Sequence, residues 1–283
     1  MFASLAALAL AAGPAPIAEW RRQCAGKDGW SDSAPPVRIY GNTYNVGTCG
    51  IVVLLVTSPE GHVMIDGATA EAVPGIAANI ARLGYRMRDV KWLLNSHEHI
   101  DHAGGLAALK RLSGAQLAAR APAVRSLATG KTDPADPQAG LIDDFEPVIV
   151  DRVIRNGDVL RVGTLEITSH ATPGHTDGGT SWSWLSCAGN PCRRIVFADS
   201  ISTPSRNGYR FTDHPERVAP YRTTFARIAA LDCDILVTPH PAASNLIERL
   251  AGKVAPVDRG ACAAYAARGR DGLAKRLASE SSK

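Results

Sequence analysis

The spacing of apolar residues changes along the chain, and each spacing predicts a kind of element. From residue 38 to residue 66, short β-branched runs alternate with turns, and the turn sequence Pro-Glu-Gly separates two apolar runs. Residues 72–83 carry apolar side chains at helical intervals, and the apolar run VKWLLNS follows them. This part of the sequence therefore predicts an antiparallel sheet that continues into a strand, helix and strand unit.

The rest of the chain repeats the order of strands followed by helices. A short helix is expected over residues 104–114, whereas residues 130–147 are polar, rich in proline and without period, which predicts a long loop. Strand-like runs return at 147–154, 165–171, 180–186 and 194–199, before a helix over 216–231, a strand over 234–239 and a last helix over 261–277. The pattern predicts an α+β fold of two similar halves, in which two sheets pack together with helices outside.

The composition fits one globular domain. The chain has 283 residues, 45% of them apolar, with no long charged tract and no compositional break. Its 31 basic residues against 27 acidic ones give a net charge of +4, and the basic residues are scattered, so we exclude nucleic acid as a partner. No stretch reaches the roughly 20 apolar residues of a membrane helix. We expect a monomer without a membrane span.

The beginning of the chain predicts export. It holds an apolar run followed by small residues and prolines, as in a secretory signal, although no Lys or Arg precedes Leu5. We therefore expect a signal peptide at residues 1–18 and a single mature domain at 19–283, located in the periplasm or secreted.

The six cysteines agree with export, because none lies in a C-x-x-C pair and an even number favours disulfides over a thiolate metal site. Cys187 and Cys192 bracket the turn sequence AGNP between two strand-like runs, so a bridge between them would close a hairpin. Other pairings, and six free thiols, are the alternatives.

Four metal-binding side chains are concentrated where a buried strand ends. His97, His99, Asp101 and His102 lie within the segment SHEHIDHAGG, residues 96–105. The two residues His97 and His99 can point to one side of an extended turn, while Asp101 and His102 are displaced along it toward a second position. Zinc in catalytic sites prefers imidazole and carboxylate ligands, three to an ion, so one short segment can serve two adjacent metal ions.

Two such sites need six ligands, so two further histidines must come from elsewhere. His175 and His240 each follow directly after a predicted strand and are flanked by Pro or Gly, which fix turns. His62, His170 and His214 lie at a hairpin edge, within a strand and at a helix start, so we assign them structural roles. The spacing predicts His175 and His240 as the remaining ligands.

The segments HEHIDH, PGHT and TPH resemble the metallo-β-lactamase superfamily, whose fold is a four-layer αββα sandwich, and the resemblance covers residues 38–249. Within the superfamily, IYGNTYNVGTCG, SHEHIDHAGG, ATPGHTDGGTSW and VFADSIS are most similar to the β-lactamases of subclass B3. The resemblance extends to three cysteine pairs, namely Cys24 with Cys49, Cys187 with Cys192, and Cys233 with Cys262.

Matched residue by residue, the resemblance implies two Zn²⁺ ions in each chain. The first would be held by His97, His99 and His175, and the second by Asp101, His102 and His240. Ser200 and Ser202 match positions where this subclass places serines near the second zinc to meet the carboxylate of the substrate.

The resemblance also implies hydrolysis of the amide bond in β-lactam antibiotics, namely penicillins, cephalosporins and carbapenems. The nucleophile would be a hydroxide shared by the two metals, with Asp101 as the catalytic residue that orients it. Residues 132–144 of the long loop are a candidate rim of the substrate site, and Gln138 is a candidate polar contact, with simple solvation as its alternative.

The alternative enzyme is a lactone or thioester hydrolase on the same fold. Such enzymes place a metal-bridging aspartate in a G-D-T segment, and Asp199 precedes Ser200 in FADSIS. The absence of that glycine and the serine pair that follows favour the β-lactamase. Asp199 and Ser202 can equally be groups that orient histidines, and a scaffold that binds iron with the same ligands is the non-catalytic alternative.

Overall fold

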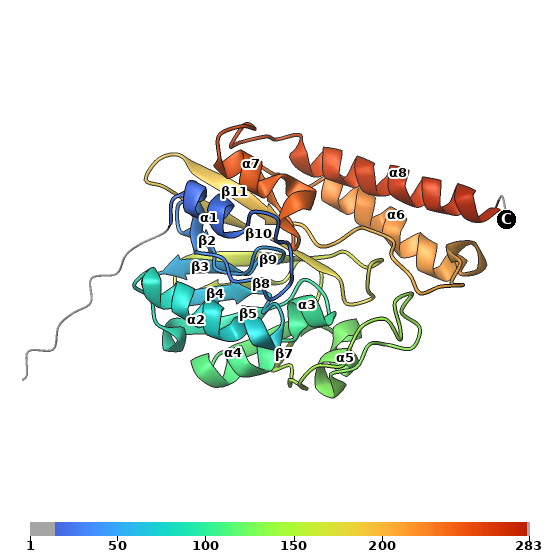
Figure 1. Ribbon diagram of the computed structural model, residues 1–283, viewed down its shortest axis with the longest axis horizontal. Coiled ribbons are helices and arrows are strands. Elements are labelled where there is room, and N and C mark those ends of the chain that lie inside the picture. Colours follow the sequence, from blue (N-terminus) through green and yellow to red (C-terminus); the bar gives the residue numbers. More distant parts are fainter. Residues whose placement is uncertain (1–14, 282–283) are drawn as a thin grey trace, which may run out of the picture.

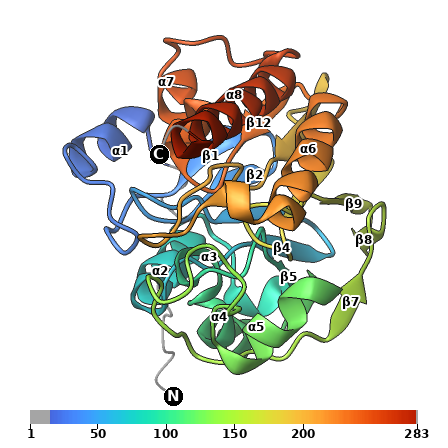
Figure 2. The same cartoon turned by 90° about the vertical axis from the view of Figure 1, so that its right-hand side faces the viewer.

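Two β-sheets lie face to face at the centre of the molecule, and helices cover the outer face of each (Figure 1 and Figure 2). The structure is a computed structural model and describes residues 15–281. The predicted αββα sandwich is confirmed. Most of the predicted signal peptide lies outside the described residues, so the signal and its end at residue 18 stay predictions.

The N-terminal sheet has seven strands in the order of the chain. Strands β1 to β4 are antiparallel to their neighbours, and β4 to β7 are parallel. The strands are β1 (Val37–Tyr40), β2 (Thr43–Asn45), β3 (Leu54–Ser58), β4 (Gly61–Ile65), β5 (Val90–Leu94), β6 (Gln116–Arg120) and β7 (Arg152–Ile154). The helices of this half are α2 (Val73–Arg82), α3 (Ile100–Ala103), α4 (Leu106–Ser113) and α5 (Val124–Thr129). As predicted, helix α4 ends at Gly114, which takes a left-handed conformation with φ of 71°.

The C-terminal sheet has five strands in the order β12-β11-β10-β9-β8. Only β11 and β12 pair in parallel. The strands are β8 (Val159–Val162), β9 (Leu165–Ala171), β10 (Thr180–Cys187), β11 (Cys192–Phe197) and β12 (Ile235–Val237). The helices that complete the described chain are α1 (Ile17–Gln23), α6 (Pro215–Ala229), α7 (Leu246–Leu250) and α8 (Ala261–Ser281). Short 3₁₀ turns lie at Ala70–Ala72, Met87–Asp89, Ala121–Ala123, Phe211–Asp213 and Pro241–Ser244.

The alternation of side chains along a strand explains why the sheets are covered on both faces. In β3, Leu54 and Val56 join the apolar core between the sheets, whereas Leu55 packs toward the helices that cover the N-terminal sheet. Both tryptophans of β10 also lie in the core between the sheets, and the indole N–H of Trp184 donates to Thr43 Oγ1 at 3.0 Å. Helices α6 and α8 pack on the outer face of the C-terminal sheet through a separate apolar cluster.

All three predicted disulfides are present. They join Cys24 to Cys49, Cys187 to Cys192, and Cys233 to Cys262. The second closes the hairpin of β10 and β11, where its two cysteines are directly paired across the strands. The third fixes the start of α8 to the segment that precedes β12.

Several helices and strands of the structure are not predicted by the spacing of apolar residues, or begin at other residues than predicted. Strand β6 has the sequence QLAAR and α5 has VRSLAT, and neither carries a clear period, so neither was predicted. The expected strand over 147–154 is regular only at β7, because residue Val148 donates its backbone N–H to Leu127 instead of a neighbouring strand. No helix among residues 15–281 is long and apolar enough to cross a membrane.

Candidate metal centre

The segment with four metal-binding side chains leaves the end of β5 and turns into the short helix α3. Asp66, at the end of the adjacent strand β4, fixes this turn. One of its carboxylate oxygens accepts the backbone N–H of Ser96 at 2.6 Å, and the other accepts the Ser96 hydroxyl at 2.7 Å. The carboxyl ends of two parallel strands thus build one rigid platform for the ligand-type residues that follow.

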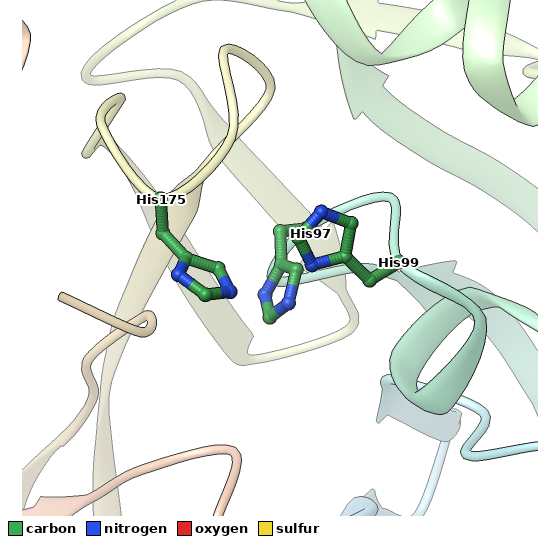
Figure 3. Close-up of side chains that lie close together, drawn as sticks. All are labelled: His97, His99 and His175. Carbon is green, nitrogen blue, oxygen red and sulfur yellow. The ribbon is translucent and has the colours of Figure 1, made fainter. Parts of the chain in front are cut away.

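Three histidine rings converge beside this platform (Figure 3). One nitrogen atom from each of His97, His99 and His175 lies within 4.8 Å of the others. The ring centroids are 4.9 Å apart for His97 and His99, and 4.7 Å apart for His97 and His175. His175 comes from the loop between β9 and β10, so the fold unites two distant parts of the chain. The structure therefore brings the first predicted ligand set together.

The second predicted set lies directly alongside. The Nε2 atom of His102 is 3.2 Å from Asp101 Oδ2 and 3.4 Å from His240 Nε2. His240 follows β12, and its Nε2 atom is 3.4 Å from the same Asp101 oxygen. His97 also belongs to a close group with Asp101 and His102, so the two sets are contiguous. The side chain of His240 is 42% exposed whereas Asp101 and His102 are buried, so the centre opens to solvent on the side of His240.

Four of the five rings are fixed by a hydrogen bond from the nitrogen that points away from the centre. Such a bond sets the tautomer and leaves the other ring nitrogen available to a metal ion. The donor and acceptor pairs are His97 Nδ1 to Asp199 Oδ1 at 2.8 Å, His99 Nε2 to Asp136 Oδ2 at 3.0 Å, His102 Nδ1 to Asp66 Oδ2 at 3.1 Å, and His175 Nδ1 to the Ser202 carbonyl at 3.0 Å. The Nε2 atom of His97 is buried and has no hydrogen-bond partner among the described residues. A metal ion would satisfy this atom.

Burial sets the charge of most of these groups. Burial and the neighbouring His99 ring lower the pKa of His175 to about 3. Burial and the neighbouring His102 ring lower the pKa of His240 to about 4. These rings are therefore neutral at pH 7, which is the form that binds metals. At His102, burial opposes the charged ring, but the Asp101 and Asp66 carboxylates outweigh it and raise its pKa to about 10.

Asp66 and Asp136 are functional candidates that the sequence did not reveal. Asp66 directly follows an apolar strand, and that position was the only available signal. Asp136 lies in the long loop, far from any motif, and no pattern connects it to His99. Its carboxylate also accepts the backbone N–H of Gln138 at 2.7 Å. The loop expected to form the rim is therefore tied directly to the histidine cluster.

The structure places the expected substrate-contacting residues on two different segments of the chain. Ser200 and Ser202 line a cavity that also borders His240. Gln138 is half-buried on the long loop and does not line that cavity. Asp199 holds His97 by one carboxylate oxygen, while its other oxygen is buried without a partner among the described residues. Ser202 orients His175 through its backbone carbonyl, so its hydroxyl is not used in that contact.

The other histidines lie outside the cluster. The His62 ring packs edge-on against Tyr85 with centroids 4.8 Å apart, and burial lowers its pKa. His170 and Ser183 form a 2.8 Å hydrogen bond between neighbouring strands, and His214 pairs with Glu216 at the start of α6. The structure does not bring any of the three to the centre.

The chain is similar to proteins of one family. Residues 46–183 match the family model described as the metallo-beta-lactamase superfamily. The crystal structure of the metallo-beta-lactamase MIM-1 from Novosphingobium pentaromativorans superposes with a TM-score of 0.91 at 51% identity, over 93% of this chain and 98% of that one. For SMB-1 the TM-score is 0.86 at 44% identity, over 89% and 99% of the two chains. For MEM-A1, a subclass B3 metallo-beta-lactamase from a soil metagenome library, it is 0.85 at 40% identity, over 90% and 99%.

Curated relatives are more distant. A hydroxyacylglutathione hydrolase from Rhodopseudomonas palustris (strain BisB18) is 34% identical over 120 residues, which are 41% of this chain and 38% of that protein. A probable metallo-hydrolase from Burkholderia pseudomallei (strain 1710b) is 34% identical over 145 residues, 47% of each chain. The chain thus spans less than half the length of these two relatives, in contrast to the nearly complete overlap with the solved structures.

Proposed function

This chain belongs to the metallo-beta-lactamase superfamily, and we propose that it is a zinc-dependent β-lactamase that hydrolyses penicillins, cephalosporins and carbapenems. The observation that carries the proposal is the convergence of two contiguous ligand sets at the open edge of the sandwich. The subclass B3 neighbour and the other solved metallo-beta-lactamases support the choice of substrate.

Two Zn²⁺ ions fit the donor atoms of the centre. Five imidazoles and one carboxylate are typical zinc ligands, three for each ion with a position left for water. The proposed ligands are His97, His99 and His175 for the first ion, and Asp101, His102 and His240 for the second. Bound zinc lowers the pKa of water to near neutrality and polarises a carbonyl group.

The protein's own groups would position the reactants. The charge of His102 and its hydrogen bond outweigh the effect of burial and lower the pKa of Asp101, so its carboxylate is ionised and can accept a hydrogen bond from the attacking water. Ser200 and Ser202 line the same cavity as His240, and their hydroxyl groups would donate to the substrate carboxylate. Gln138 stays a candidate contact on the rim.

A thioester hydrolase is the second candidate, because the curated relatives include hydroxyacylglutathione hydrolases. The position of Asp199 argues against it. Its Oδ1 atom accepts a hydrogen bond from His97 Nδ1, on the side of the ring away from the centre. A carboxylate in this place orients a metal ligand instead of bridging two ions.

Substrate comparison tests the proposal. The purified zinc-loaded protein should hydrolyse benzylpenicillin, a cephalosporin and a carbapenem with kcat/KM of about 10⁴ M⁻¹ s⁻¹ or more, within the usual range for enzymes. Its kcat/KM for S-lactoylglutathione and for a simple lactone should be at least about a hundredfold lower, because these substrates lack the ring carboxylate that the serines would hold. A higher kcat/KM for the thioester would replace the proposed function with the alternative.

Substitution of Asp199 separates the orienting role from the bridging role. Asp199→Ala should weaken zinc binding and lower kcat/KM by about 10- to 100-fold, the usual effect of losing a group that orients a metal ligand. Asp199→Asn should cost much less, since its amide oxygen can still accept the His97 N–H. Zinc affinity by competition with a chromogenic chelator measures both variants. Equal and severe losses in the two would indicate a bridging carboxylate.

We also propose that the protein is exported. Three disulfides support this location, because disulfides persist mainly in oxidising compartments such as the periplasm.

A further inference from the structure

A cavity of about 330 Å³ opens beside the metal centre. One wall is formed by His240 and by the segment that follows β11, including Ser200 and Ser202. The lining also includes the face of α8 that carries Gly269, Gly272 and Leu273. The cavity therefore joins the serines expected to hold the substrate carboxylate to the surface of α8.

Two glycines of α8 have different effects on this cavity. A Cβ atom at Gly269 would lie 2.5 Å from Ile201 Cδ1, so this glycine lets the helix approach the wall closely. A Cβ atom at Gly272 would meet no heavy atom within 4 Å. The missing side chain at Gly272 thus leaves open volume, which a larger residue could fill without a clash.

The edge of the cavity carries one positive charge. Arg268 is exposed, its Nη2 atom donates to the Ala243 carbonyl at 3.0 Å, and its guanidinium carbon lies 5.7 Å from the centre of the Tyr265 ring. No carboxylate lines the cavity, and Arg268 forms no ion pair within residues 15–281. Because a guanidinium has several N–H donors, Arg268 keeps donors for a ligand in the cavity.

We propose that this cavity is a subsite for the substituent on the fused second ring of the antibiotic, at the atom next to the carboxyl-bearing carbon, and that Arg268 selects anionic over cationic substituents there. The inference rests on the proposed function. Cephalosporins carry the carboxylate and a large substituent on adjacent ring atoms, so a carboxylate at Ser200 and Ser202 directs the substituent into the cavity. Penicillins carry only methyl groups at that place and leave the cavity empty.

The charge preference is tested with two cephalosporins that share one acylamino side chain. One carries a cationic pyridiniomethyl substituent and the other an anionic carboxylate-bearing substituent. Arg268→Glu should lower the ratio of kcat/KM for the anionic over the cationic compound by about tenfold or more, because like charges brought together oppose binding. Arg270→Glu changes the net charge equally but lies on another face of α8, against α6, and should leave the ratio within about twofold.

The volume of the subsite is tested by filling it. Gly272→Leu should raise KM about tenfold or more for cephalosporins with a large substituent, and change KM for benzylpenicillin less than about twofold, because only the former would clash. Ala274→Leu enlarges a side chain elsewhere on the same helix and should affect neither substrate. Thermal unfolding of each variant shows that it remains folded.

Hydrolysis of benzylpenicillin separates the two proposals. A wild-type protein that hydrolyses no β-lactam would overturn the proposed function and the subsite with it. Normal penicillin hydrolysis in all variants, with an unchanged charge ratio in Arg268→Glu and unchanged cephalosporin KM in Gly272→Leu, would overturn the subsite alone.

Discussion

A His175→Ala variant is expected to retain about one zinc ion per chain and to lose at least about a thousandfold in kcat/KM for every β-lactam, because loss of a metal ligand removes several kcal/mol of transition-state stabilisation. His175 is the proposed ligand that the C-terminal half would contribute to the first set, and its ring lies 4.7 Å from that of His97. Zinc content by elemental analysis and steady-state kinetics measure the two effects.

The matched control is His170→Ala. This ring lies on β9, shortly before the loop that carries His175, but it pairs with Ser183 outside the cluster. The variant should keep two zinc ions and a kcat/KM within about threefold of the wild type, as expected for a substitution away from the site. Full zinc content and activity in His175→Ala would remove this residue from the proposed ligand set.

An Asp101→Asn variant is expected to lower kcat by about 100- to 1,000-fold with a smaller change in KM, since an interaction made in the transition state is lost. The amide has nearly the same shape as the carboxylate but lacks its charge. We therefore expect it to hold the proposed second zinc less strongly and to accept a weaker hydrogen bond from the attacking water. Steady-state kinetics and zinc content in the same preparation test both expectations.

Asp232→Asn makes the same chemical change at an exposed position between α6 and β12, outside the cluster, and should leave kcat and zinc content unchanged. If Asp101→Asn keeps the wild-type kcat while both zinc ions stay bound, Asp101 is not the catalytic residue. If it loses zinc from the first set in preference to the second, the assignment of ligands to the two ions is wrong.

Much of the cluster that the structure brings together could be predicted, because the proposed ligands follow a local rule. His97, His99, Asp101 and His102 stand together in the sequence, and His175 directly follows a strand with a clear period. Functional side chains are frequent in the loops that follow strands, so histidines in such loops could be grouped from the sequence, even though His175 follows a strand of the other sheet.

The groups that orient the rings follow no such rule. Asp136 reaches His99 from an irregular loop, and the position of a loop depends on the whole fold. Arg268 and Gly272 look like ordinary positions of an amphipathic helix in the sequence. Their relation to the metal centre appears only when α8 packs beside the segment after β11. Strand β6 was missed for a similar reason, because its alanines gain their place from packing and not from propensity.

The most direct test of the central claim is hydrolysis of a penicillin, a cephalosporin and a carbapenem by the purified mature protein before and after treatment with a zinc chelator. We predict that turnover disappears with the chelator and returns as zinc is restored to about two ions per chain. Turnover that persists in metal-free protein would contradict the proposed mechanism. Absence of turnover in protein that holds two zinc ions would contradict the proposed substrate.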